Sequence, residues 1–432
     1  MRDKFYGKIS CLVHPVAEGK EGTSNVVMEA LACGVPVITT VDCGYHGERL
    51  THDENVLFAA RSTASLKTQI GRLRDDRKLR SKLSRNGRLF AERHHDICKI
   101  SFEYRNIFSA ITKGIARKRV AFLPAQSPVE NYATGRLRCL YAAEAINRYY
   151  GERYRATVGL ESQSDLIVVS QLCTAGTLTE IQSRKTQQGA KIVYDLCDPY
   201  YQRKEEVYGI FAEHRFAEIA GLADLIVTPT EELKANVIAT GCKTPVVTIP
   251  DMIDYQDRRN AELVPPAPSV VWFGNPGHGN FSSGLWALEH LNDRYRYDVC
   301  VISVPSKIKA PKSFKVVAWN YDTFVPMLRN HGFALISHAS DQTQKSNNRL
   351  LAALSNGVPA IAVGSHAAKE LLSEMGFSEM FVSTPEQLDR AVELLSDQEY
   401  RRHYVKWMQA HIEDRYGPMA VARAYSELVL RP

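Results

Sequence analysis

The amino-acid sequence predicts an α/β protein with doubly wound parallel sheets, and three observations lead to this class. Apolar runs of strand length alternate with longer helical stretches over most of the chain. A Pro-rich connector at 264–268 divides the later part of this alternation into two series. A Gly-Val-Pro element occurs at 34–36 and again at 357–359, so we expect an internal structural repeat.

Length and composition indicate a globular protein. The chain has 432 residues, of which 44% are hydrophobic and 24% charged, which is typical of a protein with two or three cores. No apolar run approaches the roughly 20 residues of a membrane span, and no segment resembles a signal peptide. The nine cysteines are scattered, which indicates reduced thiols rather than a zinc site or a disulfide framework. We therefore expect a cytoplasmic protein.

The first segment predicts a strand, a helix and a second strand. Residues 9–13 form one apolar run and residues 35–39 another, and the helix between them ends at Gly34. Free backbone N–H groups at a helix start, flanked by small residues, form a site for phosphate. The small polar residues at this start are Gly22, Thr23, Ser24 and Asn25.

Two carboxylates, Glu21 and Glu29, flank this helix start. With the Gly-x-Pro-Val strand that follows, they resemble the donor site of retaining glycosyltransferase family 4, whose motif is Glu-x7-Glu. His14-Pro15 and the segment 42–45 are similar to the lipopolysaccharide-core glucosyltransferases of that family. The resemblance implies that Glu21 contacts the transferred sugar and that Glu29 holds the nucleotide ribose. The alternative is that both are ordinary charges near a helix terminus.

Most of the positive charge lies in residues 61–119. This stretch holds seventeen Lys or Arg against five Asp or Glu, whereas the whole chain has a net charge of +6. The charges fall on helices expected at 66–73 and 79–93, where they can simply face solvent. The alternative is attachment to the anionic inner face of the cell membrane, where a lipid-linked acceptor would be found. Few interleaved aromatic residues argue against nucleic-acid binding.

The resemblance implies the GT-B fold, in which two Rossmann-like halves face each other across a cleft. Residues 1–117 would supply only the last part of a donor-binding half. We expect the remaining strands, the acceptor-binding half and a phosphate-binding Arg/Lys pair to lie upstream. Such a fragment has an unpaired sheet edge, so on its own it should be marginally stable or prone to aggregation. We therefore expect either a truncated gene or packing of this segment on the next module.

Residues 118–432 predict a complete unit of the same kind, with an acceptor-side domain at 118–250 and a donor-side domain at 251–432. The terminal helices near 398–430 are expected to cross back over the cleft. The expected strands of the first series are 119–123, 165–169, 191–194, 224–228 and 245–249. Those of the second series are 269–273, 297–302, 315–318, 332–336 and 358–363.

The second copy of the repeat lacks both carboxylates. An offset of 323 places Gln344 at the position of Glu21 and Ala352 at that of Glu29. The helix start nevertheless keeps small polar residues and two cations, which can hold a diphosphate. These residues are Lys345, Ser346, Asn347 and Arg349. The alternative is that the two cations face solvent.

A glycine-rich turn follows the first strand of the donor-side domain. It lies between Phe273 and Phe281, at a strand-to-helix junction where phosphate can approach the backbone. The candidate donor-binding residues in it are Gly274, Asn275, His278 and Gly279. The alternatives are that the turn is merely tight and that His278 is merely exposed.

Three residues of the acceptor-side domain are candidates for acceptor binding: Asn131, Arg136 and Arg138. Arg136 and Arg138 suit a phosphorylated or acidic acceptor, although Arg136 could equally form a salt bridge with its own helix. Asp198 follows the third strand, at the sheet edge where open α/β sheets bind ligands, and is the candidate catalytic carboxylate of this half. Asp before Pro is also an ordinary turn signal.

The sequence thus predicts a glycosyltransferase that moves a sugar from a nucleotide diphosphate sugar to a saccharide or lipid-linked acceptor of the cell surface. The resemblance implies that helix N-termini and cations stabilise the departing diphosphate in place of a metal, so no metal or cofactor is expected. The absence of an Asp-x-Asp motif agrees with this expectation. One alternative is a catalytically silent binding or scaffold protein. Another is a nucleotide-sugar epimerase of the same shape.

Overall fold

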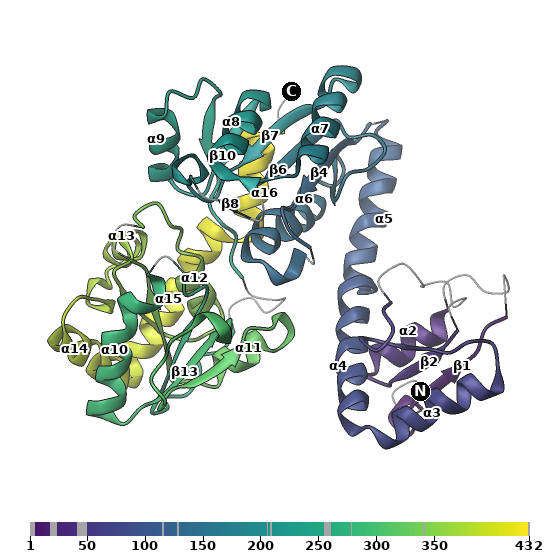
Figure 1. Ribbon diagram of the computed structural model, residues 1–432, viewed down its shortest axis with the longest axis horizontal. Helices are drawn as coiled ribbons and strands as arrows, with labels where there is room; N and C mark the ends of the chain where they lie inside the picture. The colour runs from purple at the N-terminus through teal and green to yellow at the C-terminus, as the bar shows by residue number, and fades with distance from the viewer. Residues whose placement is uncertain are drawn as a thin grey trace. The chain divides into compact units, whose positions relative to one another are not determined.

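The computed structural model describes the chain in several stretches. They are residues 5–17, 24–40, 50–114, 116–127, 129–204, 206–207, 210–254, 261–277, 279–339 and 342–430. The chain divides into two compact units, Met1–Phe108 (unit 1) and Ser109–Pro432 (unit 2), whose main sheets consist of parallel strands (Figure 1). No helix among the described residues has the length and apolar composition that a membrane crossing requires.

Unit 1 contains a three-stranded parallel sheet in the order β1-β2-β3. Its strands are β1 (Leu12–His14), β2 (Val37–Thr39) and β3 (Leu57–Phe58). Its helices are α2 (Asn25–Ala32), α3 (Thr63–Asp75), α4 (Arg77–His94) and α5 (Ile97–Thr112), and α5 contains the boundary with unit 2. Val27 and Leu31 of α2 pack with Val37 and with Phe90 of α4. The predicted order of strand, helix and strand is confirmed.

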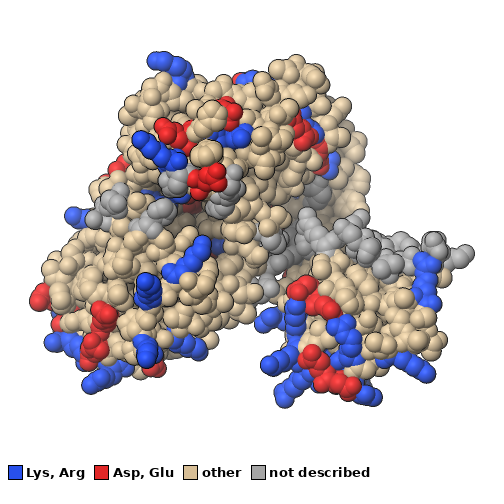
Figure 2. All heavy atoms as spheres, viewed as in Figure 1, with Lys and Arg blue, Asp and Glu red and all other residues tan. Residues whose placement is uncertain are grey.

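The two basic helices of unit 1 are also confirmed, as α3 and α4. Ser62 and Asp76 begin them, because each side chain accepts a hydrogen bond from the backbone N–H three residues on. Lys and Arg side chains gather on the surface of this unit, interspersed with acidic ones (Figure 2). Part of the charge is paired, as between Lys82 Nζ and Glu54 Oε1 at 2.5 Å.

The first half of unit 2 is a six-stranded parallel sheet in the order β11-β10-β7-β6-β4-β5. Its strands are β4 (Lys118–Leu123), β5 (Tyr154–Val158), β6 (Leu166–Ser170), β7 (Lys191–Asp195), β10 (Leu225–Thr228) and β11 (Val246–Thr248). The remaining elements are η1 (Val129–Asn131), η2 (Gly135–Leu140), α6 (Tyr141–Tyr150), α7 (Ala175–Gln188), η3 (Tyr200–Gln202), β8 (Glu206–Val207), β9 (Ile210–Phe211), α8 (Ala212–Leu222) and α9 (Glu231–Ala239). All five predicted strands are present, and β5 is an additional one.

The second half of unit 2 is another six-stranded parallel sheet, in the order β14-β13-β12-β15-β16-β17. Its strands are β12 (Ser269–Phe273), β13 (Asp298–Ser303), β14 (Lys315–Ala318), β15 (Phe333–Ser337), β16 (Ala360–Val363) and β17 (Phe381–Val382). The remaining elements are α10 (Asn280–Tyr295), η4 (Pro305–Lys307), α11 (Tyr321–Arg329), α12 (Asn348–Ser355), α13 (His366–Glu374), η5 (Ser378–Met380), α14 (Pro385–Ser396), α15 (Gln398–Tyr416) and α16 (Pro418–Leu428). The five predicted strands are again present, and β17 is additional.

The last helix returns to the first half of unit 2. In Figure 1, α16 lies among the elements of the first sheet, and it packs against α6. The ring of Tyr425 on α16 meets Phe122 of β4 edge to face, with the centroids 5.6 Å apart. Both halves therefore share one continuous core, which fixes the position of one sheet against the other.

The internal repeat is visible in the structure. Helix α12 begins and ends 323 residues after α2, and each helix follows one parallel strand and precedes the next. Gly34 and Gly357 end the two helices with φ angles of 70° and 75°, a left-handed conformation that favours glycine. The prediction that one element occurs twice is confirmed.

Candidate functional site

A cavity of about 610 Å³ lies between the two halves of unit 2. The carboxyl ends of parallel strands face it from both sheets, which is where open α/β folds bind ligands. Nine predicted site residues line it: Asn131, Arg136, Arg138, Asp198, Gly274, Asn275, Lys345, Ser346 and Arg349. The fold therefore brings together residues that the sequence analysis had assigned to donor and to acceptor binding.

Arg349 forms the centre of the donor-side wall. Its Nη2 donates to the carbonyl of Ser337 at 2.6 Å and its Nη1 to the carbonyl of Phe273 at 3.2 Å, while the guanidinium lies 5.6 Å from the centre of the Trp272 ring. Burial lowers the pKa of Arg349 to about 10, and no carboxylate among the described residues pairs with it. The side chain remains a cation at neutral pH and is partly buried in the cavity wall, without an opposite charge beside it among the described residues.

The glycine-rich turn packs directly on this arginine. Gly274 has a φ of 133°, and a Cβ atom there would lie 2.9 Å from Cδ of Arg349, so only glycine fits the turn at this point. Ser303 Oγ donates to the carbonyl of Gly274 at 2.6 Å, and the amide of Gly277 donates to Asn275 Oδ1 at 3.0 Å. The turn is thus held against the end of β13, beside the start of α12.

The other predicted donor residues lie differently. Gly279, with a φ of 73°, precedes α10 and is not among the residues that line the cavity. Asn347 donates from Nδ2 to the carbonyl of Ala367 at 3.0 Å and also lies outside the lining. His278 falls outside the described residues.

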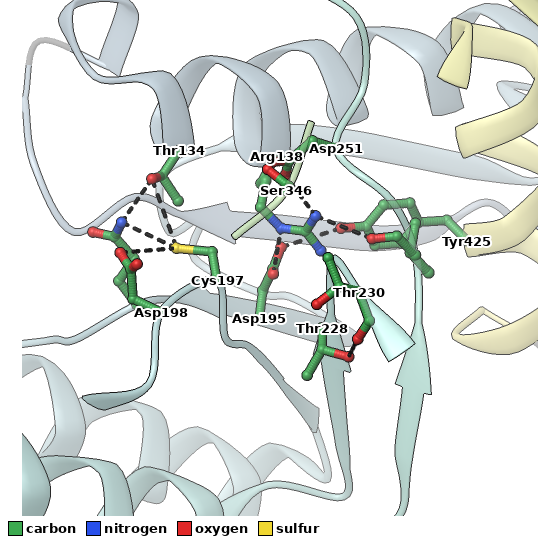
Figure 3. Close-up of polar contacts among 12 residues, drawn as sticks. Thr134, Arg138, Asp195, Cys197, Asp198, Thr228, Thr230, Asp251, Ser346 and Tyr425 are labelled. Atoms are coloured by element: carbon green, nitrogen blue, oxygen red, sulfur yellow. Dashed lines mark hydrogen bonds and ion pairs between the residues drawn. The ribbon is translucent and has the colours of Figure 1, made fainter. Parts of the chain in front are cut away.

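Arg138 ties the acceptor-side wall together. Its Nε donates to Asp195 at 2.6 Å and its Nη1 to Asp251 at 2.9 Å, and Tyr425 Oη donates to the second oxygen of Asp195 at 3.3 Å (Figure 3). Ser346 Oγ, from the donor side, donates to Asp251 at 2.5 Å. Although burial opposes it, the pKa of Arg138 is raised by the charges of Asp195 and Asp251. This network joins the two halves.

Arg136 is buried in a second ion pair. Its Nη2 lies 2.5 Å from Asp254 Oδ2, and its guanidinium lies 5.0 Å from the centre of the Trp319 ring. Tyr141 Oη also donates to Asp254, at 3.3 Å. The structure thus contains an ion pair for Arg136, as the alternative interpretation held, although its partner is on the segment that crosses between the halves. Acceptor contact by Arg136 or Arg138 stays a prediction.

Asp198, the candidate catalytic carboxylate, pairs with Lys345 across the cavity. Lys345 therefore already has a carboxylate partner, in contrast to Arg349. A second contact also links the halves, since Thr230 Oγ1 donates to the carbonyl of Gln344, the residue before Lys345, at 3.2 Å.

Three cavity residues near Asp198 were not identified as site residues from the sequence: Thr134, Gln171 and Cys197. Gln171 directly follows β6, has a φ of 62° and donates from Nε2 to Thr134 Oγ1 at 2.7 Å. Cys197 lies beside Thr134 and Asp198 (Figure 3), and burial raises the pKa of its thiol, which stays neutral. A strained non-glycine residue is often part of a functional site, but no sequence pattern marks it.

Two more cavity residues on the donor side were not found either. Asn280 begins α10, directly after the glycine-rich turn, and His338 directly follows β15. Both are buried, and Asn280 Oδ1 and His338 Nδ1 have no hydrogen-bond partner among the described residues. Burial and the charges of Arg349 and Lys345 lower the pKa of His338 to about 2, so the ring is neutral.

The predicted donor site of unit 1 is described in part. Ser24 is buried, with Oγ 3.1 Å from Nε2 of His14, and Asn25 is the exposed first residue of α2. Glu29 accepts a hydrogen bond from Tyr6 Oη at 3.2 Å. Glu21, Gly22 and Thr23 lie outside the described residues, as does the segment 42–45. In neither unit do the described residues include a group of three or more His, Cys, Asp or Glu placed to hold a metal.

Comparisons with known proteins give a family match in unit 1 and matches to solved structures of similar fold. Residues 2–90 match the model of the family described as glycosyl transferases group 1. No curated protein matches the chain. The structure of Alr3699/HepE from Anabaena with UDP and glucose is 13% identical and covers 73% of this chain and 100% of that one, with a TM-score of 0.53.

Two further structures complete the comparison. Alr3699/HepE with UDP-glucose covers 72% of this chain and 99% of that one, at 13% identity and a TM-score of 0.53. The apo form of the lipopolysaccharide outer core galactosyltransferase WaaB is 12% identical and covers 72% of this chain and 99% of that one, with a TM-score of 0.43. The chain thus has the GT-B fold, and its residues 2–90 match the model of the glycosyl transferases group 1 family.

Proposed function

We propose that unit 2 transfers a sugar from a nucleotide diphosphate sugar to a saccharide or lipid-linked acceptor in the assembly of cell-surface polysaccharide or lipopolysaccharide. The observation that carries this proposal is Arg349, a partly buried cation without a carboxylate partner among the described residues, in the wall of a cavity between two Rossmann-like halves. A bound diphosphate would supply the negative charge that Arg349 lacks beside it. The HepE structures contain UDP and UDP-glucose, which supports a uridine nucleotide as the first ligand to test.

The proposed chemistry needs no metal or other cofactor. As the sugar leaves, negative charge builds up on the diphosphate, and cations with backbone N–H groups at a helix start stabilise that charge. Arg349 and Lys345 lie at the start of α12, beside the glycine-rich turn. The diphosphate takes the place of Asp198 on Lys345 and leaves that carboxylate free on the acceptor side. In a retaining reaction, a diphosphate oxygen then accepts the proton of the attacking hydroxyl.

The proposal extends to the remaining predicted residues. Asn131, Arg136 and Arg138 face the acceptor. In unit 1, Glu21 and Glu29 occupy the positions of the family's sugar-binding and ribose-binding carboxylates, and the donor itself binds in unit 2. The basic helices α3 and α4 hold the protein at the inner face of the membrane. Sedimentation with anionic vesicles at low salt tests this attachment, and a protein that stays in the supernatant refutes it.

Calorimetry of the full chain with UDP and UDP-glucose tests the donor site. Arg349→Met keeps the bulk of the side chain and removes its charge, so we expect the affinity for both ligands to fall by roughly a hundredfold. The matched control is Arg401→Met. Arg401 is buried and donates to the carbonyls of Val264 and Gly332, but it does not line the cavity.

The control should lose stability and keep its affinity for UDP. If Arg349→Met binds UDP as tightly as the unsubstituted chain does, the proposed site is wrong.

A catalytically silent binding protein is the second candidate. It is favoured by the ion pairs that already occupy Lys345, Arg136 and Arg138, and by Gln344 and Ala352 at the positions of the two family carboxylates. An assay that follows release of UDP from UDP-glucose, with glycan acceptors supplied, separates the two candidates. Tight binding without any release of UDP favours the silent protein.

A further inference from the structure

Asn280 and His338 leave two polar atoms unsatisfied in the wall of the same cavity. Buried side-chain polar atoms in proteins usually have a hydrogen-bond partner, and an atom without one marks a place for a ligand or water. Asn280 Oδ1 and His338 Nδ1 have none among the described residues, although both side chains are more than nine-tenths buried.

The backbone holds both residues in place. The amide of His338 donates to the carbonyl of Val363 at 3.1 Å, and a Cβ at Gly364 would lie 2.3 Å from the His338 carbonyl oxygen. Ser337 Oγ donates to the carbonyl of Asn280 at 2.5 Å and accepts from Trp272 Nε1 at 2.8 Å. The ends of β12 and β15 and the start of α10 are therefore tied together.

The hydrogen bond made by the amide nitrogen of Asn280 fixes the orientation of its carboxamide. Nδ2 donates to the carbonyl of Asn275 at 3.3 Å, and a carbonyl can pair only with a donor. Oδ1 is therefore the unsatisfied atom, and it can only accept a hydrogen bond. Its ligand must supply an N–H or an O–H group.

His338 presents a neutral ring. Arg349 and Lys345 are the charged groups that act on it, and together with burial they keep it unprotonated at physiological pH. A neutral ring nitrogen accepts or donates according to its tautomer. A hydroxyl group can satisfy either tautomer and can also donate to Asn280, whereas a diphosphate at neutral pH offers only lone pairs.

We propose that Asn280 and His338 form a subsite that binds a hydroxyl group of the nucleotide sugar, beside the diphosphate position at Arg349. This inference rests on the proposed function. In the second copy of the repeat, Gln344 and Ala352 replace the two carboxylates that bind sugar and ribose hydroxyls in the family. In this chain, Asn280 and His338 bind the hydroxyl group in place of those carboxylates. The hydroxyl comes from the transferred sugar or from the ribose.

Calorimetry of the full chain with UDP, UDP-glucose and 2′-deoxy-UDP tests the subsite. Asn280→Leu and His338→Leu remove the polar atoms and keep an apolar side chain of moderate size. For a sugar hydroxyl, each variant should bind UDP-glucose about tenfold more weakly and bind UDP unchanged. For the ribose 2′-hydroxyl, UDP binding also weakens about tenfold, and 2′-deoxy-UDP binding does not change.

Tyr194→Phe is the matched control. Tyr194 Oη is also buried without a partner among the described residues, but the residue does not line the cavity, so its removal should leave all three affinities unchanged. The subsite is refuted if Asn280→Leu and His338→Leu bind all three ligands as the unsubstituted chain does. If the unsubstituted chain binds none of them, the proposed function fails, and the subsite fails with it.

Discussion

Three side chains in the cavity wall, Arg349, Asn280 and His338, lack the partners that their polar groups usually have: Arg349 has no carboxylate beside it among the described residues, and the other two each have an unsatisfied polar atom. Arg349 was found from the sequence because it follows a helix start in a recognisable repeat. His338 and Asn280 were not, because burial and the absence of a partner are properties of the folded chain alone. Gln171 was missed for a similar reason, because no sequence pattern predicts a positive φ angle at a glutamine.

His338 predicts a dependence of stability on pH. The folded chain keeps this ring neutral down to a pH of about 2, while the unfolded chain protonates it below its ordinary pKa of 6.5. The unfolded state therefore binds more protons, and stability is lost as the pH falls below 6.5, by about 1.4 kcal/mol per pH unit from this group. Chemical unfolding at pH 7 and pH 5 should show a loss about 2 kcal/mol smaller in His338→Leu than in the unsubstituted chain. Equal losses would contradict this assignment.

Elements with a strong apolar run or a marked helix end could be predicted from the sequence. Ten strands of unit 2 and the strand–helix–strand of unit 1 are where the patterns placed them. The strands that were missed, β3, β5, β8, β9 and β17, each lie at the edge of a sheet. Edge strands are short and partly exposed, so their residues lack the continuous apolar character that marks a central parallel strand.

The repeat supplies a matched pair of glycines. A Cβ at Gly357 would lie 2.1 Å from the backbone oxygen of Glu262, whereas a Cβ at Gly34 would meet nothing closer than Ser84 Oγ at 3.4 Å. Both positions are left-handed, so alanine at either costs about 1 kcal/mol in backbone strain, and only Gly357→Ala adds a backbone clash.

Hydrogen exchange should therefore show a much larger loss of protection in α12 of Gly357→Ala than in α2 of Gly34→Ala. Similar losses of protection at the two helices would contradict this prediction, because the backbone around Glu262 would then accommodate the added Cβ without loss of stability.

In the molecule as a whole, contacts between distant residues set the geometry of the site. Arg136 and Asp254 are 118 residues apart, and Arg138 and Asp251 are 113 residues apart. The sequence indicated that these arginines face the cleft, but it could not show which acids neutralise them, because such pairs depend on how the two sheets pack. The same holds for Lys345 and Asp198, which were predicted separately as donor and catalytic residues and form one ion pair.

The central claim is that the donor site lies in unit 2, at α12, and not at the family motif of unit 1. Titration of UDP-glucose into two variants of the full chain, Glu29→Gln and Arg349→Met, tests it directly. We expect Glu29→Gln to bind UDP-glucose as tightly as the unsubstituted chain does, and Arg349→Met to lose binding. Loss of binding in Glu29→Gln, with unchanged affinity in Arg349→Met, would contradict it.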